Sequence, residues 1–220
     1  MRLRILIAML CISGAALIYA PFAVAHRLDE YLQASRISVD PGRVSIEIDL
    51  TPGAAVAGSI IASIDADNDG EISPSEGEAY ARQVLGSAVL EVDQQPQSIR
   101  LVSNRFPSIG EMNEGVGVIR LFASAETAPA AMGRHRLFYR NTHQPEMSVY
   151  LANALVPASN AVRIEAQQRS VGQHELRFDY LISFGAGSLW ASLWWLAPVG
   201  AFLAFVTSHR FRKGVRETIE

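Results

Sequence analysis

Apolar and polar residues alternate in short segments along most of the chain. In residues 43–50, RVSIEIDL, every second side chain is apolar, which predicts a β-strand with one buried face. Residues 36–39 form a second candidate, and the turn-forming triplet Asp40-Pro41-Gly42 between the two segments predicts a hairpin. Further strand candidates cover residues 88–92, 98–102, 115–123, 135–140, 148–155, 161–166 and 174–181. Short strands separated by turn residues predict a mainly β fold, namely a β-sandwich.

Two helical patterns interrupt this alternation. Thr51-Pro52 fits an N-cap followed by proline at the first helical position, which predicts a helix that extends to about Ile64. After an acidic stretch, the tetrapeptide 73–76, SPSE, fits a capping box that begins a second helix, and this helix is predicted to end at Gly86. The sandwich is therefore expected to carry a helix-loop-helix insertion at residues 52–86.

The first 25 residues fit a secretory signal peptide. They contain two arginines, an apolar run and the small-residue triplet Ala23-Val24-Ala25, which predicts cleavage before His26. The alternative is a retained membrane helix, which Pro21 and the cleavage triplet make less favourable. Cys11 is the one cysteine of the sequence, so the exported domain, residues 26–182, is expected to have no disulfide and to depend on its core or a bound ion.

A second apolar segment lies near the other end of the sequence. Residues 180–209 contain no charged side chain, and the run 188–207 has the length of a membrane-spanning helix. Basic residues in the segment 208–220 predict a cytoplasmic tail, because positive residues stay on the cytoplasmic side. This pattern predicts a single span in the bacterial inner membrane, with the folded domain facing the periplasm. A cleaved sorting tail and a buried soluble helix are the competing interpretations.

Composition restricts the class of partner. The sequence has a formal net charge of −3, and without the signal peptide it has 17 basic and 22 acidic residues. An acidic balance without a basic cluster in the exported domain argues against nucleic acid as a partner. Lys213 is the single lysine among 19 basic residues, a bias typical of GC-rich bacterial genomes. The expected partners are the membrane and a protein in the same membrane, which the polar segment 140–145 could contact.

The acidic stretch 65–76, DADNDGEISPSE, has the spacing of a calcium loop. Such loops place oxygen ligands at positions 1, 3, 5, 7, 9 and 12 and glycine at position 6. Gly70 is at position 6. The candidate ligands are Asp65, Asp67, Asp69, Glu71 through its backbone carbonyl, Ser73 and Glu76. In these residues the segment 52–86 resembles the EF-hand family, and the resemblance implies that one Ca2+ binds within the loop.

Charge gives the physical reason for an ion in this loop. Four carboxylates, those of Asp65, Asp67, Asp69 and Glu76, are expected to converge and to repel one another unless a cation lies between them. Seven oxygen ligands suit Ca2+ better than the smaller, octahedral Mg2+. A single extracytoplasmic loop is expected to bind weakly, which favours a structural role over a regulatory one. The alternative is an acidic turn that binds no ion.

Histidine provides a second candidate metal site. After cleavage, His26 would carry the terminal amine, and an amine beside an imidazole can chelate copper or nickel, with His135 or His143 as a further ligand. Structural, hydrogen-bonded histidines are the alternative. The order of signal peptide, Ala25-His26 start with Leu28, β-rich domain and apolar C-terminal segment resembles the HupE/UreJ family of nickel transporters. That resemblance implies a periplasmic Cu- or Ni-binding accessory protein of a metal transporter.

Catalytic motifs are not found in the sequence. It contains no HExxH, GxSxG or phosphate-binding loop, and His174-Glu175 is not followed by a second zinc histidine. We therefore expect a binding or assembly module and not an enzyme. An exported enzyme without a recognisable motif is the third hypothesis.

Overall fold

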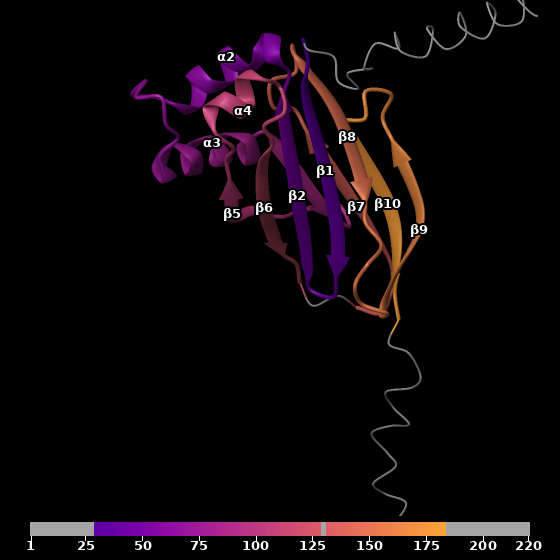
Figure 1. Cartoon of the computed structure of the whole chain (residues 1–220). Helices are drawn as coiled ribbons and strands as arrows, with labels where there is room; N and C mark the ends of the chain where they lie inside the picture. The colour runs from indigo at the N-terminus through magenta and orange to yellow at the C-terminus, as the bar shows by residue number, and fades with distance from the viewer. Residues whose placement is uncertain (1–28, 129–130, 184–220) are drawn as a thin grey trace, which may run out of the picture.

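The computed structural model describes residues 29–128 and 131–183, which form a mainly β structure with two five-stranded, mostly antiparallel sheets (Figure 1). The first sheet has the order β5 (Arg100–Arg105), β6 (Ile119–Glu126), β2 (Arg43–Pro52), β1 (Tyr31–Asp40) and β8 (Ser148–Ala154). The second sheet has the order β4 (Gln95–Pro96), β3 (Ala88–Val92), β7 (Gly133–Asn141), β10 (Glu175–Ile182) and β9 (Val162–Arg169). The mainly β fold predicted from the alternating segments is confirmed.

The hairpin of β1 and β2 is the centre of the first sheet. The two strands pair antiparallel from Tyr31 with Pro52 to Asp40 with Arg43, and Gly42 adopts a φ of +84° in the turn. Buried and half-buried positions alternate along β1, so one face of the hairpin meets the core. Both strands are longer than predicted, because the pairing continues through residues whose side chains do not alternate clearly in the sequence.

The edge strand β8 joins the first sheet in the parallel direction. Tyr31 of β1 pairs with Ser148 of β8. Side chains of β9, in the other sheet, bond to the backbone of β8: Arg169 Nε donates to the carbonyl of Ala152 over 2.7 Å, and Gln167 Oε1 accepts from the Ala154 amide over 3.2 Å. These bonds occupy backbone groups that an open strand edge would offer to another chain.

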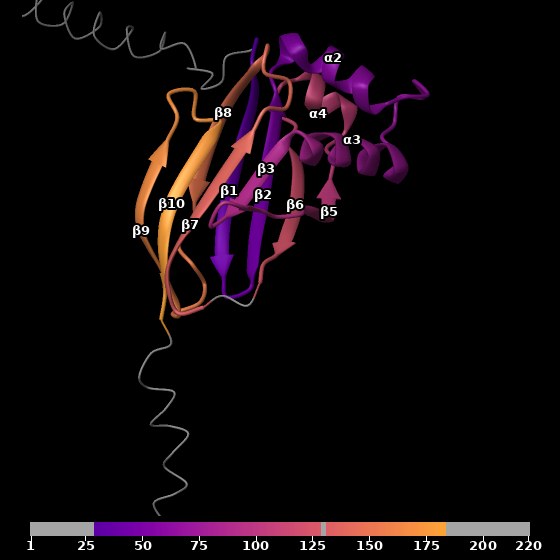
Figure 2. The same ribbon diagram turned by 180° about the vertical axis from the view of Figure 1, so that it is seen from behind.

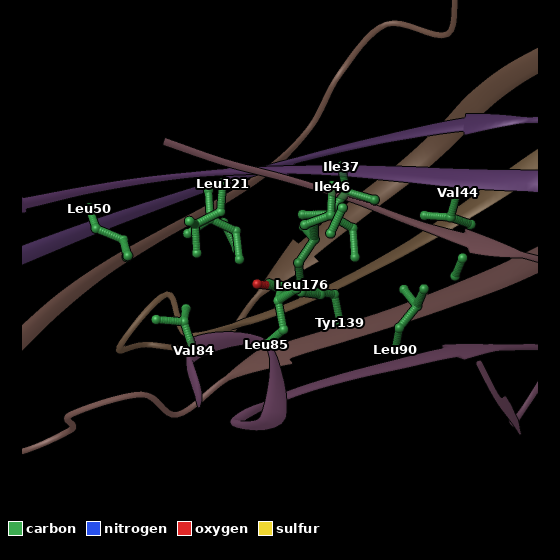
Figure 3. Packing of buried hydrophobic residues seen from close by; sticks show 14 of the residues in the cluster. Ile37, Val44, Ile46, Leu50, Val84, Leu85, Leu90, Leu121, Tyr139 and Leu176 are labelled. Carbon is green, nitrogen blue, oxygen red and sulfur yellow. The ribbon is translucent and has the colours of Figure 1, made fainter. Parts of the chain in front are cut away.

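One hydrophobic core lies between the sheets. Figure 3 shows side chains of the first sheet, including Ile37 and Ile46, pointing toward Tyr139 and Leu176 of the second sheet. All four side chains are buried. Helix α3 (Pro74–Gly86) adds its apolar face to this core. The helix-loop-helix segment is therefore part of the packed core.

Three helices lie beside the sheets, at the end where β1 begins, as the two opposite views show (Figures 1 and 2). They are α2 (Ala54–Ile64), α3 and the short α4 (Ile109–Asn113). The predicted start of the first helix is wrong: Thr51 and Pro52 are the last residues of β2, and Gly53 is the N-cap, without a side-chain bond. The pairing with β1 extends to Pro52, beyond the last β6 partner at Leu50. Proline is tolerated there because only one strand flanks it.

The segment from 98 to 126 also differs from its prediction. The candidate strand 98–102 lies further along the chain, as β5, and the candidate 115–123 overlaps β6 from residue 119, later than predicted, because α4 and a turn precede it. Ser108 and Glu111 form a capping box for α4, and Gly115 has a φ of +73° in the turn that follows. Four-residue capping signals of this kind are easily hidden among short strand patterns.

Within the described residues, no helix is long and apolar enough to cross a membrane. The predicted signal peptide, the predicted span 188–207, the predicted tail 208–220 and His26 lie outside the described residues.

Candidate metal centre

The acidic loop connects α2 to α3. Asp65 follows the last residue of α2, and Ser73 is the N-cap of α3 with a complete capping box to Glu76, as predicted. Ile64, just before the loop, is buried, and Ile72, inside it, packs against the core. Apolar anchors on both sides thus fix the ends of an otherwise exposed, charged segment.

Three of the predicted ligands come together in the structure. Carboxylate oxygens of Asp65, Asp67 and Glu76 all lie within 4.8 Å of one another. Asp65 is buried, Glu76 is half-buried and Asp67 is exposed. Among the described residues, no arginine forms an ion pair with these three carboxylates. Their mutual repulsion is therefore not compensated by a neighbouring cationic side chain.

Backbone amides hold the Asp65 carboxylate in place. Asp65 Oδ1 accepts from the amide of Asp69 over 3.2 Å, and Oδ2 accepts from the amide of Gly70 over 3.1 Å. To bring these two amides back to the Asp65 side chain, the loop adopts left-handed backbone at two residues, with φ values of 58° at Asn68 and 85° at Gly70. Glycine and asparagine adopt this conformation at the lowest cost. The loop conformation therefore explains why asparagine and glycine occur at positions 68 and 70.

Glu76 joins the start of the loop to its end. Its Oε1 accepts from the Ala66 amide over 2.7 Å, and its Oε2 accepts from the amide and the hydroxyl of Ser73 over 2.9 and 2.8 Å. The bond from the Ser73 amide, followed by the bonds from the Ser73 hydroxyl and the Ala66 amide, lowers the pKa of the Glu76 carboxyl below its ordinary value. The residue therefore stays ionised at neutral pH.

The other three predicted ligands form local hydrogen bonds. Asp69 Oδ1 accepts from the Glu71 amide over 2.8 Å, and Asp69 does not belong to the cluster of three. Ser73 Oγ donates to Glu76 and contacts Ser75 Oγ at 3.1 Å. Glu71 was predicted to contribute only its carbonyl. Among the predicted carboxylate ligands, three therefore lie together and that of Asp69 does not, while the Ser73 hydroxyl is bonded directly to Glu76 of the cluster.

The chemistry of these donors fits a hard divalent cation. All are oxygens, and three are carboxylates that converge without a compensating cation among the described side chains. Calcium accepts six to eight oxygen ligands in flexible geometry, whereas Mg2+ demands a nearly ideal octahedron. Asp65, Asp67 and Glu76 would hold the ion, with Asp69, Ser73 and the carbonyl of Glu71 available in the loop.

A buried polar network connects α3 to both sheets, and the sequence did not reveal it. The hydroxyls of Tyr31, on β1, and Tyr80, on α3, lie 2.8 Å apart, and Tyr80 also contacts His143 Nε2 at 3.1 Å. Burial raises the pKa of Tyr80 to about 12 and lowers the pKa of His143 to about 4. Tyr80 lies four residues after Glu76, so the network begins one helical turn from the acidic loop.

The backbone around His143 is also held by buried side chains. Gln33 Nε2 and the Tyr150 hydroxyl donate to the carbonyl of His143 over 2.8 and 2.7 Å, and Asn141 Oδ1 accepts from its amide over 3.0 Å. Asn141 Nδ2 in turn donates to Gln33 Oε1 over 2.8 Å. From the sequence, His143 and the polar segment 140–145 are predicted to have other roles, whereas Gln33 and Tyr150 give no signal because they come from distant segments.

The histidines considered for copper or nickel lie far apart. His135, on β7, bonds through Nδ1 to Asp93 and through Nε2 to the carbonyl of Ala131. His143 follows the opposite end of the same strand. The six residues of extended strand from His135 to Asn141 already span about 20 Å, so these two side chains cannot bind one ion. Binding at His26 stays a prediction.

Comparison of the chain with models of protein families, with curated proteins and with solved structures gave no match.

Proposed function

We propose that this chain is a membrane-anchored, extracytoplasmic β-sandwich module whose EF-hand-like loop binds one structural Ca2+. The convergence of Asp65, Asp67 and Glu76 without an arginine partner among the described residues is the observation that carries this proposal. The module acts by binding or assembly with a protein in the same membrane and not by catalysis. The apolar run 188–207 supplies the anchor.

The structural role follows from what the loop connects. A cation that holds Asp65 and Glu76 together fixes the end of α2 against the start of α3. Through Tyr80, α3 is bonded to Tyr31 of the first sheet and to His143 beside the second. Ordering the loop therefore stabilises the contact of both helices with the core. In a domain expected to have no disulfide, such a connection adds stability to an inserted segment.

The stabilisation has a modest size. Single extracytoplasmic sites of this type have dissociation constants of roughly 10^-4 to 10^-3 M. At a free calcium concentration ten times the dissociation constant, binding raises the free energy of unfolding by about 1.4 kcal/mol. A contribution of this size supports the fold without acting as a switch.

Calorimetric titration of the full chain in lipid nanodiscs tests the proposal. Ca2+ is expected to bind with one site per chain and Mg2+ to bind more weakly. Glu76→Gln is expected to weaken Ca2+ binding at least tenfold, because it removes one carboxylate charge while glutamine still fits the capping box.

The matched control is Glu78→Gln, two residues further along the same helix. Glu78 pairs with Arg82 on the exposed face and has no place in the cluster, so calcium affinity is expected to stay unchanged. Absence of a calcium heat in the wild-type chain, or equal affinities of the wild type and Glu76→Gln, would overturn the proposal.

A further inference from the structure

The end of the molecule where β10 stops exposes apolar side chains. Val156 is 91 % exposed and Met132 is 70 % exposed, and Leu155 is also exposed. A groove beside them is lined by residues of the loop and of β9, among them Pro157 and Ile164. In both views, this end lies opposite α2 (Figures 1 and 2).

Backbone bonds hold the loop 155–161 at this end. The Leu155 amide donates to the carbonyl of Ile37, near the last residues of β1, over 2.8 Å. The Ser183 amide donates to the carbonyl of Ala161, also over 2.8 Å. The last described residue of the chain is therefore bonded directly to the loop that presents Val156.

The length of the connection to the predicted span limits the distance to the bilayer. Five residues lead from Ser183 to Ser188, the first residue of the apolar run. Fully extended, they cover at most about 17 Å, of which the headgroup region on one side of a bilayer takes up roughly 5–8 Å. The end that carries Val156 is thus the one held closest to the membrane.

We propose that this end is a second membrane contact, with the side chains of Leu155, Val156 and Met132 inserted at the boundary between headgroups and acyl chains of the outer leaflet. The proposal rests on the membrane anchor of the proposed function. These apolar side chains are exposed at the end of the molecule that leads into the predicted span, and their burial in lipid is more favourable than their exposure to water. The acidic loop beside the opposite end of the first sheet then faces away from the membrane.

Charge at this end supports an apolar contact. Arg43 is paired with Glu126, and both Arg134 and Arg163 are paired with Glu165. Because two glutamates pair with these three arginines, only one positive charge of the group is not offset, so attraction to anionic lipids contributes little. The contact is therefore expected to persist when the ionic strength is raised.

Site-specific fluorescence of the full chain in vesicles tests the contact. The chain carries Cys11→Ser, so a cysteine introduced at position 156 is the single label site for a polarity-sensitive dye. Val171→Cys is the matched control: this valine is 105 % exposed and lies between β9 and β10, at the opposite end of the second sheet. Vesicles contain phosphatidylcholine and phosphatidylglycerol, with or without brominated acyl chains.

For the label at 156, we expect a blue-shifted emission and at least a twofold quenching by brominated lipid, at both low and high salt. For the label at 171, we expect neither the blue shift nor the quenching. Equal behaviour of the two labels in vesicle-bound protein overturns this contact and leaves the anchor intact. Shielding of label 156 from aqueous iodide without quenching by brominated lipid indicates a protein in place of lipid and also overturns it. Release of the chain from vesicles by an alkaline wash overturns the anchor and the contact together.

Discussion

At the scale of single residues, two polar arrangements carry the testable chemistry of the molecule, the carboxylates of the acidic loop and the buried imidazole of His143. Glu76 is held by two backbone amides and a hydroxyl, and it faces two further carboxylates. His143 is buried against Tyr80, and Tyr80 contacts Tyr31. The converging carboxylates around Glu76 favour binding of a cation, whereas burial keeps the imidazole of His143 neutral. Both have measurable consequences for stability.

The buried imidazole predicts a pH dependence. Burial lowers the pKa of His143 to about 4 in the folded protein, whereas a histidine in an unfolded chain titrates near 6.5. Between these values the unfolded chain binds a proton that the folded protein does not bind, so the free energy of unfolding falls as the pH decreases. Over the whole window the loss is on the order of 3 kcal/mol. Urea unfolding at pH 7, 6 and 5 measures the slope.

His143→Gln is expected to flatten this slope while glutamine keeps a polar partner for Tyr80. His135→Gln is the matched control: the bond to Asp93 raises the pKa of His135, so His135 is protonated in both states below about pH 6. Between pH 6 and 5 the control is expected to retain the wild-type slope, whereas between pH 7 and 6 it is expected to lose stability somewhat more steeply than the wild type, because His135 binds more protons in the folded state there. A slope of equal size in His143→Gln would show that other groups cause it.

At the scale of elements, α3 connects the acidic loop to the core. The capping box of Ser73 and Glu76 fixes its first turn, and its buried face includes Tyr80 and Val84. The helix also packs against the segment after β5, where the ring of Phe106 meets Tyr80 edge to face with centroids 6.2 Å apart. The helix therefore has one position in which both its cap and its packing are satisfied.

Two glycines of α3 provide a test of this packing. A Cβ at Gly77 would lie 2.9 Å from the Phe106 ring, whereas a Cβ at Gly86 would meet nothing within 4 Å. Gly77→Ala is expected to lower the free energy of unfolding by about 1 kcal/mol, because the overpacking outweighs the better helix propensity of alanine. Gly86→Ala is expected to raise it by roughly 0.5 kcal/mol.

Thermal or urea unfolding of the two variants, in the presence of calcium, measures this difference. An equal gain in both variants would mean that Phe106 moves aside freely and that α3 is not tightly packed on this face.

At the scale of the whole molecule, the two sheets are expected to unfold as one cooperative unit, because their inner faces share a core. Ile48 of β2 is fully buried, and Val102 of β5 is exposed beside a register shift in its strand. Bonds from β9 side chains to the backbone of β8 connect the sheets along one edge as well. Loss of packing in one sheet is therefore transmitted to the other.

Ile48→Ala is expected to reduce the free energy of unfolding by about 2–4 kcal/mol, and Val102→Ala by less than about 0.5 kcal/mol. Amide hydrogen exchange is expected to accelerate in β7 and β10 as well as in β2 in the Ile48 variant, because both sheets open together. Faster exchange confined to the first sheet would indicate two independent units.

The sequence by itself determined the features that depend on neighbouring residues. The alternation in 43–50 with its turn at Gly42, the capping box that begins at Ser73, and the spacing of carboxylates around Gly70 are all local, and the structure contains each of them. A local pattern indicates which backbone conformation a segment prefers and which of its faces is buried. It therefore locates a helix or strand well but does not fix the residues at which the element begins and ends. The predicted cap at Thr51 failed for this reason, since strand pairing extended over it.

Only the tertiary structure decided which distant segments meet. The parallel pairing of β1 with β8 and the contacts that join Tyr31, Tyr80 and His143 connect residues tens of positions apart. No periodicity encodes such contacts, because they result from the packing of two sheets and a helix around a shared core. The acidic loop differs from these contacts: Asp65, Asp67 and Glu76 lie within twelve residues of one another, so the approach of their carboxylate oxygens to within 4.8 Å depends on the local spacing and on the capping box that begins α3.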